Sequence, residues 1–304
     1  EAVIMQAWIP ITILAAFSQN LRFMLQKRLK DTRLSATGAT FARFVYSAPL
    51  VAVLMAAYFE LTGIEVPRPH VRFFVFAFTG GIAQILATIC VIALFAKRNF
   101  AVGITFKKTE VVLTALTGLL VLGEGIGTAG IVAILIGFVG LLLLSDPPEG
   151  GQGWRRFFNK AAALGLGAGL LFSFSAIGYR GASLSLTAED VVARAGFTLA
   201  VVTAFQSLIM AGWMVLRQKG EVTRVFAAWR VGMLVGLSSM IGSFCWFTAF
   251  TLQNAALVKA LGQVELLFSY AATLFVFREK VSGREYAGTA LILGSVLVLI
   301  LFMK

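Results

Sequence analysis

Apolar residues run almost without interruption over stretches of 18 to 27 positions along this 304-residue chain, and only short polar connections separate them. About 20 apolar residues in a helix cross the roughly 30 Å hydrocarbon layer of a bilayer, and in lipid only helices and closed barrels satisfy every backbone polar group. The runs are continuous rather than alternating, which favours helices. We therefore predict an all-α polytopic membrane protein with ten transmembrane helices, over residues 8–26, 40–59, 73–96, 100–122, 125–145, 161–182, 190–216, 231–250, 255–277 and 286–303.

Composition supports lipid as the surrounding solvent. Hydrophobic residues make up 59% of the chain and charged residues 13%, and the mean hydropathy is +0.89. Soluble domains carry about 25% charged residues, so a soluble fold of this length could not cover so much apolar surface. The net charge of +12 raises the question of a nucleic-acid partner. We expect none, because Lys and Arg lie in short clusters between the apolar runs.

The distribution of basic residues predicts the orientation in the membrane. The connections after the odd-numbered helices hold 16 of the 26 Lys and Arg residues, whereas the opposite side holds Arg68, Arg72 and Lys304. Basic residues accumulate on the cytoplasmic side of membrane proteins. The odd-numbered connections are therefore expected to be cytoplasmic, with both chain termini external.

An internal repeat appears when the chain is compared with itself at an offset of 155 residues. Polar and small residues then coincide at equivalent places of the predicted spans: Glu110 with Glu265, Glu124 with Glu279, Gly81 with Gly236, Cys90 with Cys245, and Asn99 with Asn254. We predict two five-helix halves, residues 1–145 and 161–304, joined by a linker at 146–160 that is rich in Pro and Gly at its start. An odd number of helices inverts the second half. Inverted repeats are common in secondary transporters, where the substrate site lies near the midplane between the repeats.

Each half closes with a similar run of residues. Asn99-Phe100-Ala101 leads through Glu110 to Gly123-Glu124, and Asn254-Ala255-Ala256 leads through Glu265 to Arg278-Glu279-Lys280; a helix rich in small residues follows each run. This pattern resembles the EamA-type repeat of the drug/metabolite transporter superfamily, with the bacterial aromatic amino-acid exporters as the most similar branch.

The resemblance implies a transporter of the bacterial inner membrane that functions as a monomer. It also implies a central cavity lined by helices one, three, four, six, eight and nine, with helices five and ten as peripheral supports. This chain departs from the family pattern at Lys107-Lys108 in helix four and at Gln263-Val264 in helix nine.

Ionisable residues inside the spans are candidate functional groups, because charge is costly in lipid. Glu110 and Glu265 lie near the middles of helices four and nine. Three interpretations are open: a proton site, acceptors for a substrate ammonium, or carboxylates held by a neighbouring cation. Lys107 lies three residues before Glu110 and shares its face. Lys259 and Gln263, one turn apart in helix nine, could receive a substrate carboxylate, or Lys259 could snorkel to the outer interface.

Neutral polar and aromatic residues complete the predicted binding site. The candidates on helices one, three, six and eight are Asn20, Gln84, Thr88, Ser175, Tyr179, Ser243 and Trp246. Gln84 and Thr88 are four residues apart, so they share one helix face. Such residues also serve as interhelical hydrogen-bond partners. An aromatic and amide lining suits a ligand with an apolar body and a polar end. The arginines near the span ends, Arg22, Arg43, Arg180 and Arg194, are expected to snorkel or to form structural pairs.

These observations predict a secondary transporter that exports small metabolites, most favourably aromatic or other neutral amino acids, by alternating access. The alternative is an exporter of drugs or nucleotide sugars with the same fold. A phosphate-bearing ligand would require more converging cations than Lys259, the deep lysine of helix nine. An enzyme is disfavoured because the only histidine, His70, lies in a loop and no catalytic arrangement is apparent. A channel would need no inverted repeat. No metal or cofactor is expected.

Overall fold

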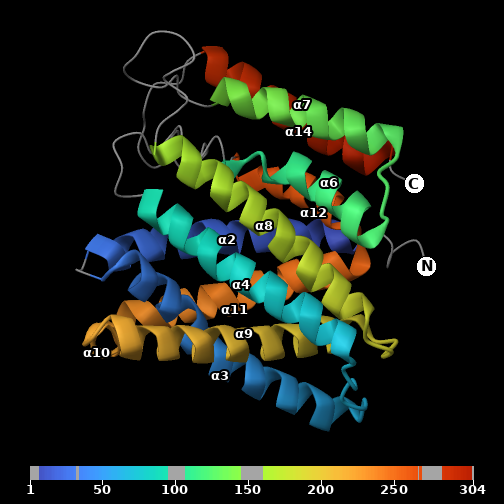
Figure 1. Cartoon of the computed structure of the whole chain (residues 1–304). Helices are drawn as coiled ribbons and strands as arrows, with labels where there is room; N and C mark the ends of the chain where they lie inside the picture. Colours follow the sequence, from blue (N-terminus) through green and yellow to red (C-terminus); the bar gives the residue numbers. More distant parts are fainter. Residues whose placement is uncertain are drawn as a thin grey trace.

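The computed structural model describes residues 7–31, 34–94, 107–144, 160–265, 267–268 and 283–302, and the regular secondary structure in these ranges is helical. Most helices run side by side across the molecule (Figure 1). They are α2 (Trp8–Asp31), α3 (Ala36–Thr62), α4 (Val71–Leu94), α6 (Glu110–Leu122), α7 (Thr128–Leu144), α8 (Lys160–Leu184), α9 (Val191–Arg217), α10 (Glu221–Ala227), α11 (Trp229–Leu252), α12 (Ala255–Leu261), the 3-10 turn η2 (Gly262–Val264) and α14 (Gly283–Phe302).

Local sequence signals set the helix ends. The Ser35 side chain accepts a hydrogen bond from the backbone N–H of Gly38 at the start of α3, and Asp190 caps α9 in the same way. The helices α3 and α6 end at Gly63 and Gly123, whose φ angles of 67° and 69° are left-handed and favour glycine. These signals explain why the helix ends lie within a few residues of most of the predicted span ends.

Two features differ from the prediction. The short helix α10 lies in the connection between α9 and α11, where no helix was expected. The prediction of one continuous helix over 255–277 was wrong, because the α-helix α12 ends at Leu261 and the 3-10 turn η2 follows it. A side chain at Gly262 would meet the ring of Trp246, so the chain changes its winding where it packs closely on this ring. The linker 146–159, Asn99 and Glu279 lie outside the described residues.

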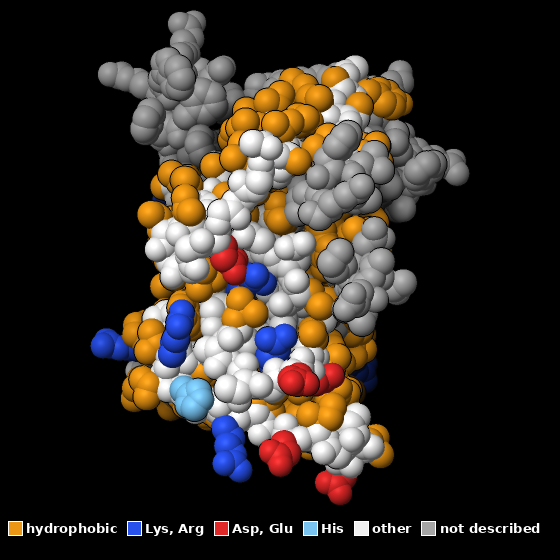
Figure 2. All heavy atoms as spheres, turned by 90° about the vertical axis from the view of Figure 1, so that its right-hand side faces the viewer, with side chains coloured by type: hydrophobic (Ala, Val, Ile, Leu, Met, Phe, Trp, Pro, Cys, Tyr) orange, Lys and Arg blue, Asp and Glu red, His pale blue; other side chains and the backbone are white. Residues whose placement is uncertain are grey.

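Five of the described helices are long and apolar enough to cross a membrane: α3, α4, α9, α11 and, from Ala163, α8. Large apolar side chains are exposed on the outside of the bundle, such as Leu120 at 82% and Leu216 at 78%. In water such exposure would be unfavourable, whereas in a bilayer these side chains face lipid. Figure 2 shows one end of the molecule, where acidic and basic side chains gather between apolar flanks. The chain is a multi-pass membrane protein.

The helices pack in pairs that join the two halves. Helix α4 packs along α8, α2 packs along α11, and α3 packs along α9, while α6 contacts α12. Helices α7 and α14, the fifth and tenth predicted spans, pack on each other at one edge of the bundle (Figure 1). Each of these contacts therefore pairs one helix from residues 1–145 with one from residues 161–304.

Glycines permit the closest of these crossings. A Cβ atom on Gly178 of α8 would lie 2.8 Å from Cα of Gly80 and 2.8 Å from the carbonyl oxygen of Phe76 on α4. A Cβ on Gly169 would lie 2.8 Å from the carbonyl oxygen of Lys107. Small residues let membrane helices approach backbone to backbone. This contact brings α8 against the turn that precedes α6.

Candidate functional site

Five ionisable side chains meet at the centre of the bundle, and we call them the charge cluster: Lys107, Lys108, Glu110, Lys259 and Glu265. The first three lie on and just before the start of α6, and they are 5%, 4% and 4% exposed. Lys259 lies on α12, and Glu265 directly follows η2. The cluster therefore joins one helix of each half at the level where the sequence predicts the middle of the membrane.

The ion pairs cross between the two halves. Lys259 Nζ lies 2.6 Å from Glu110 Oε1, and Lys107 Nζ lies 3.4 Å from Glu110 Oε2. Glu265 Oε1 pairs with Lys108 and lies 3.8 Å from Lys107 Nζ. Each glutamate thus contacts a lysine of the opposite half. Buried charges of opposite sign attract strongly in a low-dielectric interior, so these pairs hold α6 and α12 together.

Neutral groups from other helices surround the charge cluster. Gln19 of α2 donates a hydrogen bond of 2.8 Å from Nε2 to Glu265 Oε2. Lys259 Nζ lies 4.5 Å from the ring centre of Trp246 on α11, and Phe172 of α8 lies 5.3 Å from Lys107 Nζ. An aromatic face attracts a cation without a formal counter-charge. Lysines held by rings in this way retain positive charge that is available to an anion.

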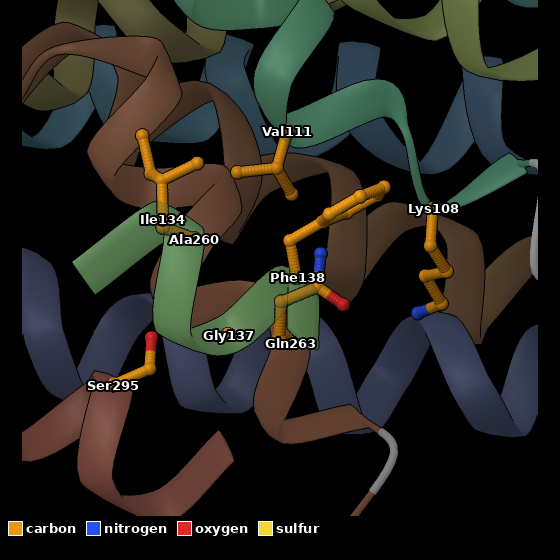
Figure 3. Close-up of a pocket in the computed structure, with 8 residues that line it drawn as sticks. All are labelled: Lys108, Val111, Ile134, Gly137, Phe138, Ala260, Gln263 and Ser295. Atoms are coloured by element: carbon orange, nitrogen blue, oxygen red, sulfur yellow. The ribbon is translucent and has the colours of Figure 1, made fainter. Parts of the chain in front are cut away.

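A pocket opens onto the charge cluster, between α2, α6, α11 and α12. Its lining comprises Gln19, Lys107, Lys108, Glu110, Val111, Trp246, Lys259, Gly262, Gln263 and Glu265. Its free interior holds little more than a water molecule, so a larger ligand would fit only if the surrounding side chains moved. A second pocket shares Lys108, Val111 and Gln263 with the first, and its lining also includes Phe138 of α7 and Ser295 of α14 (Figure 3).

Arg43 is the centre of a second buried group. Its guanidinium donates hydrogen bonds to Thr88 Oγ1 at 3.1 Å, to Ser239 Oγ at 3.2 Å and to Ser243 Oγ at 3.4 Å. These hydroxyls come from α4 and α11, and Arg43 is 3% exposed. The predicted site residues Thr88 and Ser243 therefore bind the same cation.

A third group links α4, α8 and α9. Tyr179 donates its hydroxyl proton to Gln84 Oε1 at 2.9 Å, and Gln206 Nε2 donates to the same oxygen at 3.0 Å and to the backbone oxygen of Gly81. The Tyr179 ring stacks on Phe247 of α11 with 4.2 Å between ring centres. These buried polar groups bond one another, although Gln206 Oε1 has no hydrogen-bond partner among the described residues.

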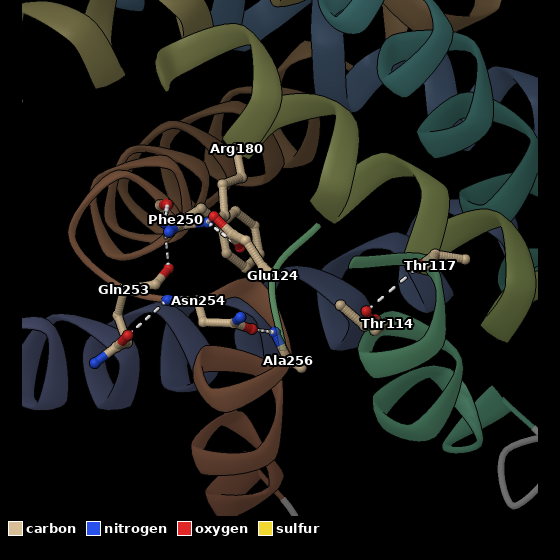
Figure 4. Close-up of polar contacts among 8 residues, drawn as sticks. All are labelled: Thr114, Thr117, Glu124, Arg180, Phe250, Gln253, Asn254 and Ala256. Atoms are coloured by element: carbon tan, nitrogen blue, oxygen red, sulfur yellow. Dashed lines mark hydrogen bonds and ion pairs between the residues drawn. The ribbon is translucent and has the colours of Figure 1, made fainter. Parts of the chain in front are cut away.

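Arg180 links several elements at the end of the bundle that is predicted to be external (Figure 4). Its Nε donates to both oxygens of Glu124 at 2.7 and 2.8 Å. Its Nη1 donates to the backbone oxygens of Phe250 and Gln253, where α11 ends. The neighbouring Asn254 caps α12 by accepting from the N–H of Ala256 at 2.9 Å. The predicted structural pairing of Arg180 is therefore present.

The structure brings most of the predicted site residues into these groups. Glu110, Glu265, Lys107, Lys259, Trp246 and Gln263 surround the first pocket, while Thr88 and Ser243 bind Arg43, and Gln84 and Tyr179 bind each other. Ser175 is buried on α8, and Asn20 is half-buried on α2. Neither of them lines the first pocket.

The structure decides between the alternatives given for three cations and corrects one expectation. Arg22 and Arg43 do not snorkel, because both are 3% exposed. Lys259 does not snorkel either, because its Nζ lies against Glu110. Lys259 is also not the one deep lysine, since Lys107 and Lys108 reach the same carboxylates from helix four. The sequence shows each residue's depth, but not which faces of helices four and nine meet.

The predicted binding site left out four residues that the structure places in these groups, namely Gln19, Arg43, Lys108 and Gln206. Gln19 and Arg22 are three residues apart on α2, so their shared face was a usable signal. Gln206 carried the signal of a lone amide in an apolar run of α9. Such a residue finds a partner only in the fold.

Comparison with known proteins finds a family match in the first half of the chain. Residues 6–146 match the model of the EamA-like transporter family. This part of the chain is therefore similar to EamA-like transporters. A solved structure titled only "Crystal structure of protein" covers 95% of this chain and 98% of its own, with a TM-score of 0.62 and 17% sequence identity. At that identity the likeness shows the fold, and 28 chains of solved structures match in all. Comparison with curated proteins finds no match.

The matched family is described as transporters, and the match covers the part of this chain that contains α2, α3, α4, α6 and α7. The charge cluster is contributed partly by the matched half, through α6, and partly by the second half, through α12.

Proposed function

We propose that this EamA-like chain is a secondary transporter that exports small metabolites across the bacterial inner membrane by alternating access. The observation that carries the proposal is the charge cluster, in which Glu110 and Glu265 each contact a lysine of the opposite half. Ionisable groups at mid-membrane mark substrate or ion pathways. The direction of transport and the membrane follow from the family resemblance.

The arrangement of the helix pairs supports an inverted repeat. The offset of 155 residues relates α2 to α8 and α4 to α11. The same exchange converts the packing of α4 on α8 into the packing of α11 on α2, and both packings are present. Two halves related in this way can exchange shapes, and this exchange opens opposite faces of the membrane protein in turn.

Closure around the charge cluster supports a carrier rather than an open pore. The pocket beside Lys107 and Lys259 has little free room, and Arg180 bonds Glu124 at the predicted external end. A substrate can reach the cluster only after one end of the bundle opens. Such opening and closing is the step that sets the rate in many transporters and enzymes.

The prediction of an amino-acid substrate depended on Lys259 as the one deep lysine, whereas three lysines meet at the charge cluster. A carboxylate remains a suitable partner for these lysines, and the aromatic rings of Phe172 and Trp246 suit an apolar body. An amino acid offers both features, and other small organic acids offer them as well.

Counterflow in liposomes tests the proposal. The purified chain is reconstituted, the liposomes are loaded with an unlabelled compound, and uptake of the same labelled compound is followed for amino acids, dicarboxylates and sugar phosphates. An alternating-access carrier accelerates uptake when its substrate is present on both sides, whereas a channel does not.

The matched variants are Lys259→Gln and Lys219→Gln, since Lys219 is an exposed residue between α9 and α10. We expect acceleration for at least one compound class, about tenfold weaker in Lys259→Gln and unchanged in Lys219→Gln. Acceleration by no compound class would refute the proposal.

A further inference from the structure

Positive charge exceeds negative charge in the interior of the bundle. Lys107, Lys108 and Lys259 meet Glu110 and Glu265, which leaves one lysine charge uncompensated within the charge cluster. All five side chains are at least 86% buried, with Glu265 the most exposed at 14%. A buried charge without a counter-charge is costly, and more so in a membrane.

Two buried arginines increase this surplus. Arg22 lies one turn beyond Gln19 on α2, close enough to Lys107, Glu265 and Arg43 for their charges to interact. Arg22 donates to the neutral Gln26 at 2.8 Å, and Arg43 donates to hydroxyls. In the described part of the chain, no carboxylate lies within ion-pair distance of either arginine. With these two arginines, five buried cations outnumber the two carboxylates of the charge cluster.

An unused hydrogen-bond donor lies in the same pocket. Trp246 Nε1 is buried and has no hydrogen-bond partner among the described residues, although its ring packs beside Lys259. Trp246 is 8% exposed and lines the pocket with Gln263. An indole N–H can only donate, so it requires an acceptor. Buried polar groups are normally satisfied, and a ligand oxygen would satisfy this one.

We propose that the transported substrate is a small organic anion whose carboxylate or phosphate oxygens bind between Lys107, Lys259 and the N–H of Trp246. This inference rests on the proposed transport function and names its substrate class. A zwitterionic amino acid brings no net charge, so it leaves the surplus uncompensated. An anion compensates the surplus and gives Trp246 its acceptor in one step.

Carboxylates and phosphates both accept hydrogen bonds from the lysines and the indole N–H that line the pocket. Charge-assisted hydrogen bonds from lysine to carboxylate or phosphate oxygens are about twice as strong as neutral ones. The glutamates keep Lys107 and Lys259 at fixed positions, so that little ordering is needed when an anion binds. Glu110 and Glu265 then act as positioning residues.

Thermal unfolding of the purified chain in detergent measures binding without transport. The probes are succinate for carboxylates, glycerol 3-phosphate for phosphate monoesters and phenylalanine for zwitterions, each compared with sodium chloride of equal ionic strength. We expect at least one anion to raise the Tm by about 5 °C at a hundredfold excess over its Kd, and phenylalanine to raise it much less. The larger of the two anion shifts identifies the oxyanion.

Variants locate the effect. Lys259→Gln should weaken anion binding about tenfold, Lys259→Arg should retain most of it, and the exposed Lys219→Gln should change nothing. If Lys259→Gln does not fold, Lys108→Gln provides the same removal of one buried charge. Anion shifts no larger than those of sodium chloride, or equal shifts with phenylalanine, would overturn the inference.

The two proposals can fail separately. Stabilisation by an anion without counterflow would support the anion site and refute transport. Counterflow of amino acids without stabilisation by either anion would support transport and refute the anion site.

Discussion

At the scale of single residues, the function of this chain depends on where a few charges find partners. Glu110 and Glu265 were predicted with three alternative roles, and the structure places both beside lysines. A carboxylate held by lysines is a poor acceptor for a substrate ammonium, because the lysines already occupy its oxygens. The groups that remain for a ligand are the lysines, the indole donor of Trp246 and the side-chain oxygen of Gln263, which has no partner among the described residues.

The indole donor gives the first prediction. Trp246→Phe keeps an aromatic ring beside Lys259 and removes the N–H, so the affinity for the anion should fall about tenfold with little change in stability. Ligand-dependent thermal unfolding measures both quantities. The control is Trp213→Phe, because Trp213 is 56% exposed on α9. Equal affinity in the two variants would show that the indole N–H does not bind the substrate.

The carboxylates give the second prediction. Glu265→Gln removes the negative charge that Lys107 and Lys108 share, and breaking a buried ion pair costs about 3–5 kcal/mol. We expect a clearly lower Tm in detergent than for Glu60→Gln, since Glu60 is exposed on α3. Adding Lys108→Met to Glu265→Gln should restore part of the loss. A Tm equal to that of Glu60→Gln would contradict a structural role for the pair.

At the scale of elements, the sequence predicts helices far better than it predicts their contacts. Continuous apolar runs and capping residues such as Ser35 and Gly123 set the ends of the helices to within a few residues. The break after Leu261 was not predictable, because it depends on the approach of Trp246 to Gly262. Convergence of Lys107 and Lys259 likewise depends on which faces of α6 and α12 meet, and periodicity carries no information about that.

Helix contact gives the third prediction. A Cβ on Gly178 would lie 2.8 Å from Cα of Gly80, whereas a Cβ on Gly167 of the same helix meets nothing within 4 Å. Gly178→Ala should therefore destabilise the protein by about 1–3 kcal/mol through overpacking, and Gly167→Ala should not. Thermal unfolding compares them. A destabilisation of the same size in both variants would mean that α4 and α8 are not in the close contact described.

At the scale of the whole molecule, the proposed transport mechanism requires two halves in opposite orientations. Residues 6–146 match the EamA-like family, the fold-level likeness extends over 95% of the chain, and the helix pairs join one half to the other. The distribution of Lys and Arg predicts which ends of the helices face the cytoplasm.

Orientation gives the fourth prediction. In a background with Cys90→Ala and Cys245→Ala, a cysteine at Gly125, in the connection between α6 and α7, should react with an impermeant thiol reagent in intact cells. A cysteine at Gly151, in the predicted linker, should react only after the membrane is opened. The reverse pattern would invert the topology and with it the predicted direction of export.

Alternating access is best tested by measuring whether the charge cluster can be reached from each side of the membrane. Gln263 lines the pocket beside Lys259. In the same cysteine-free background, Gln263→Cys is exposed to a small anionic methanethiosulfonate in right-side-out and in inside-out vesicles. Alternating access predicts that the cysteine is modified from both sides, and that an anionic substrate lowers both rates. Modification from one side only, without protection by any substrate, would contradict a site reached alternately from the two sides.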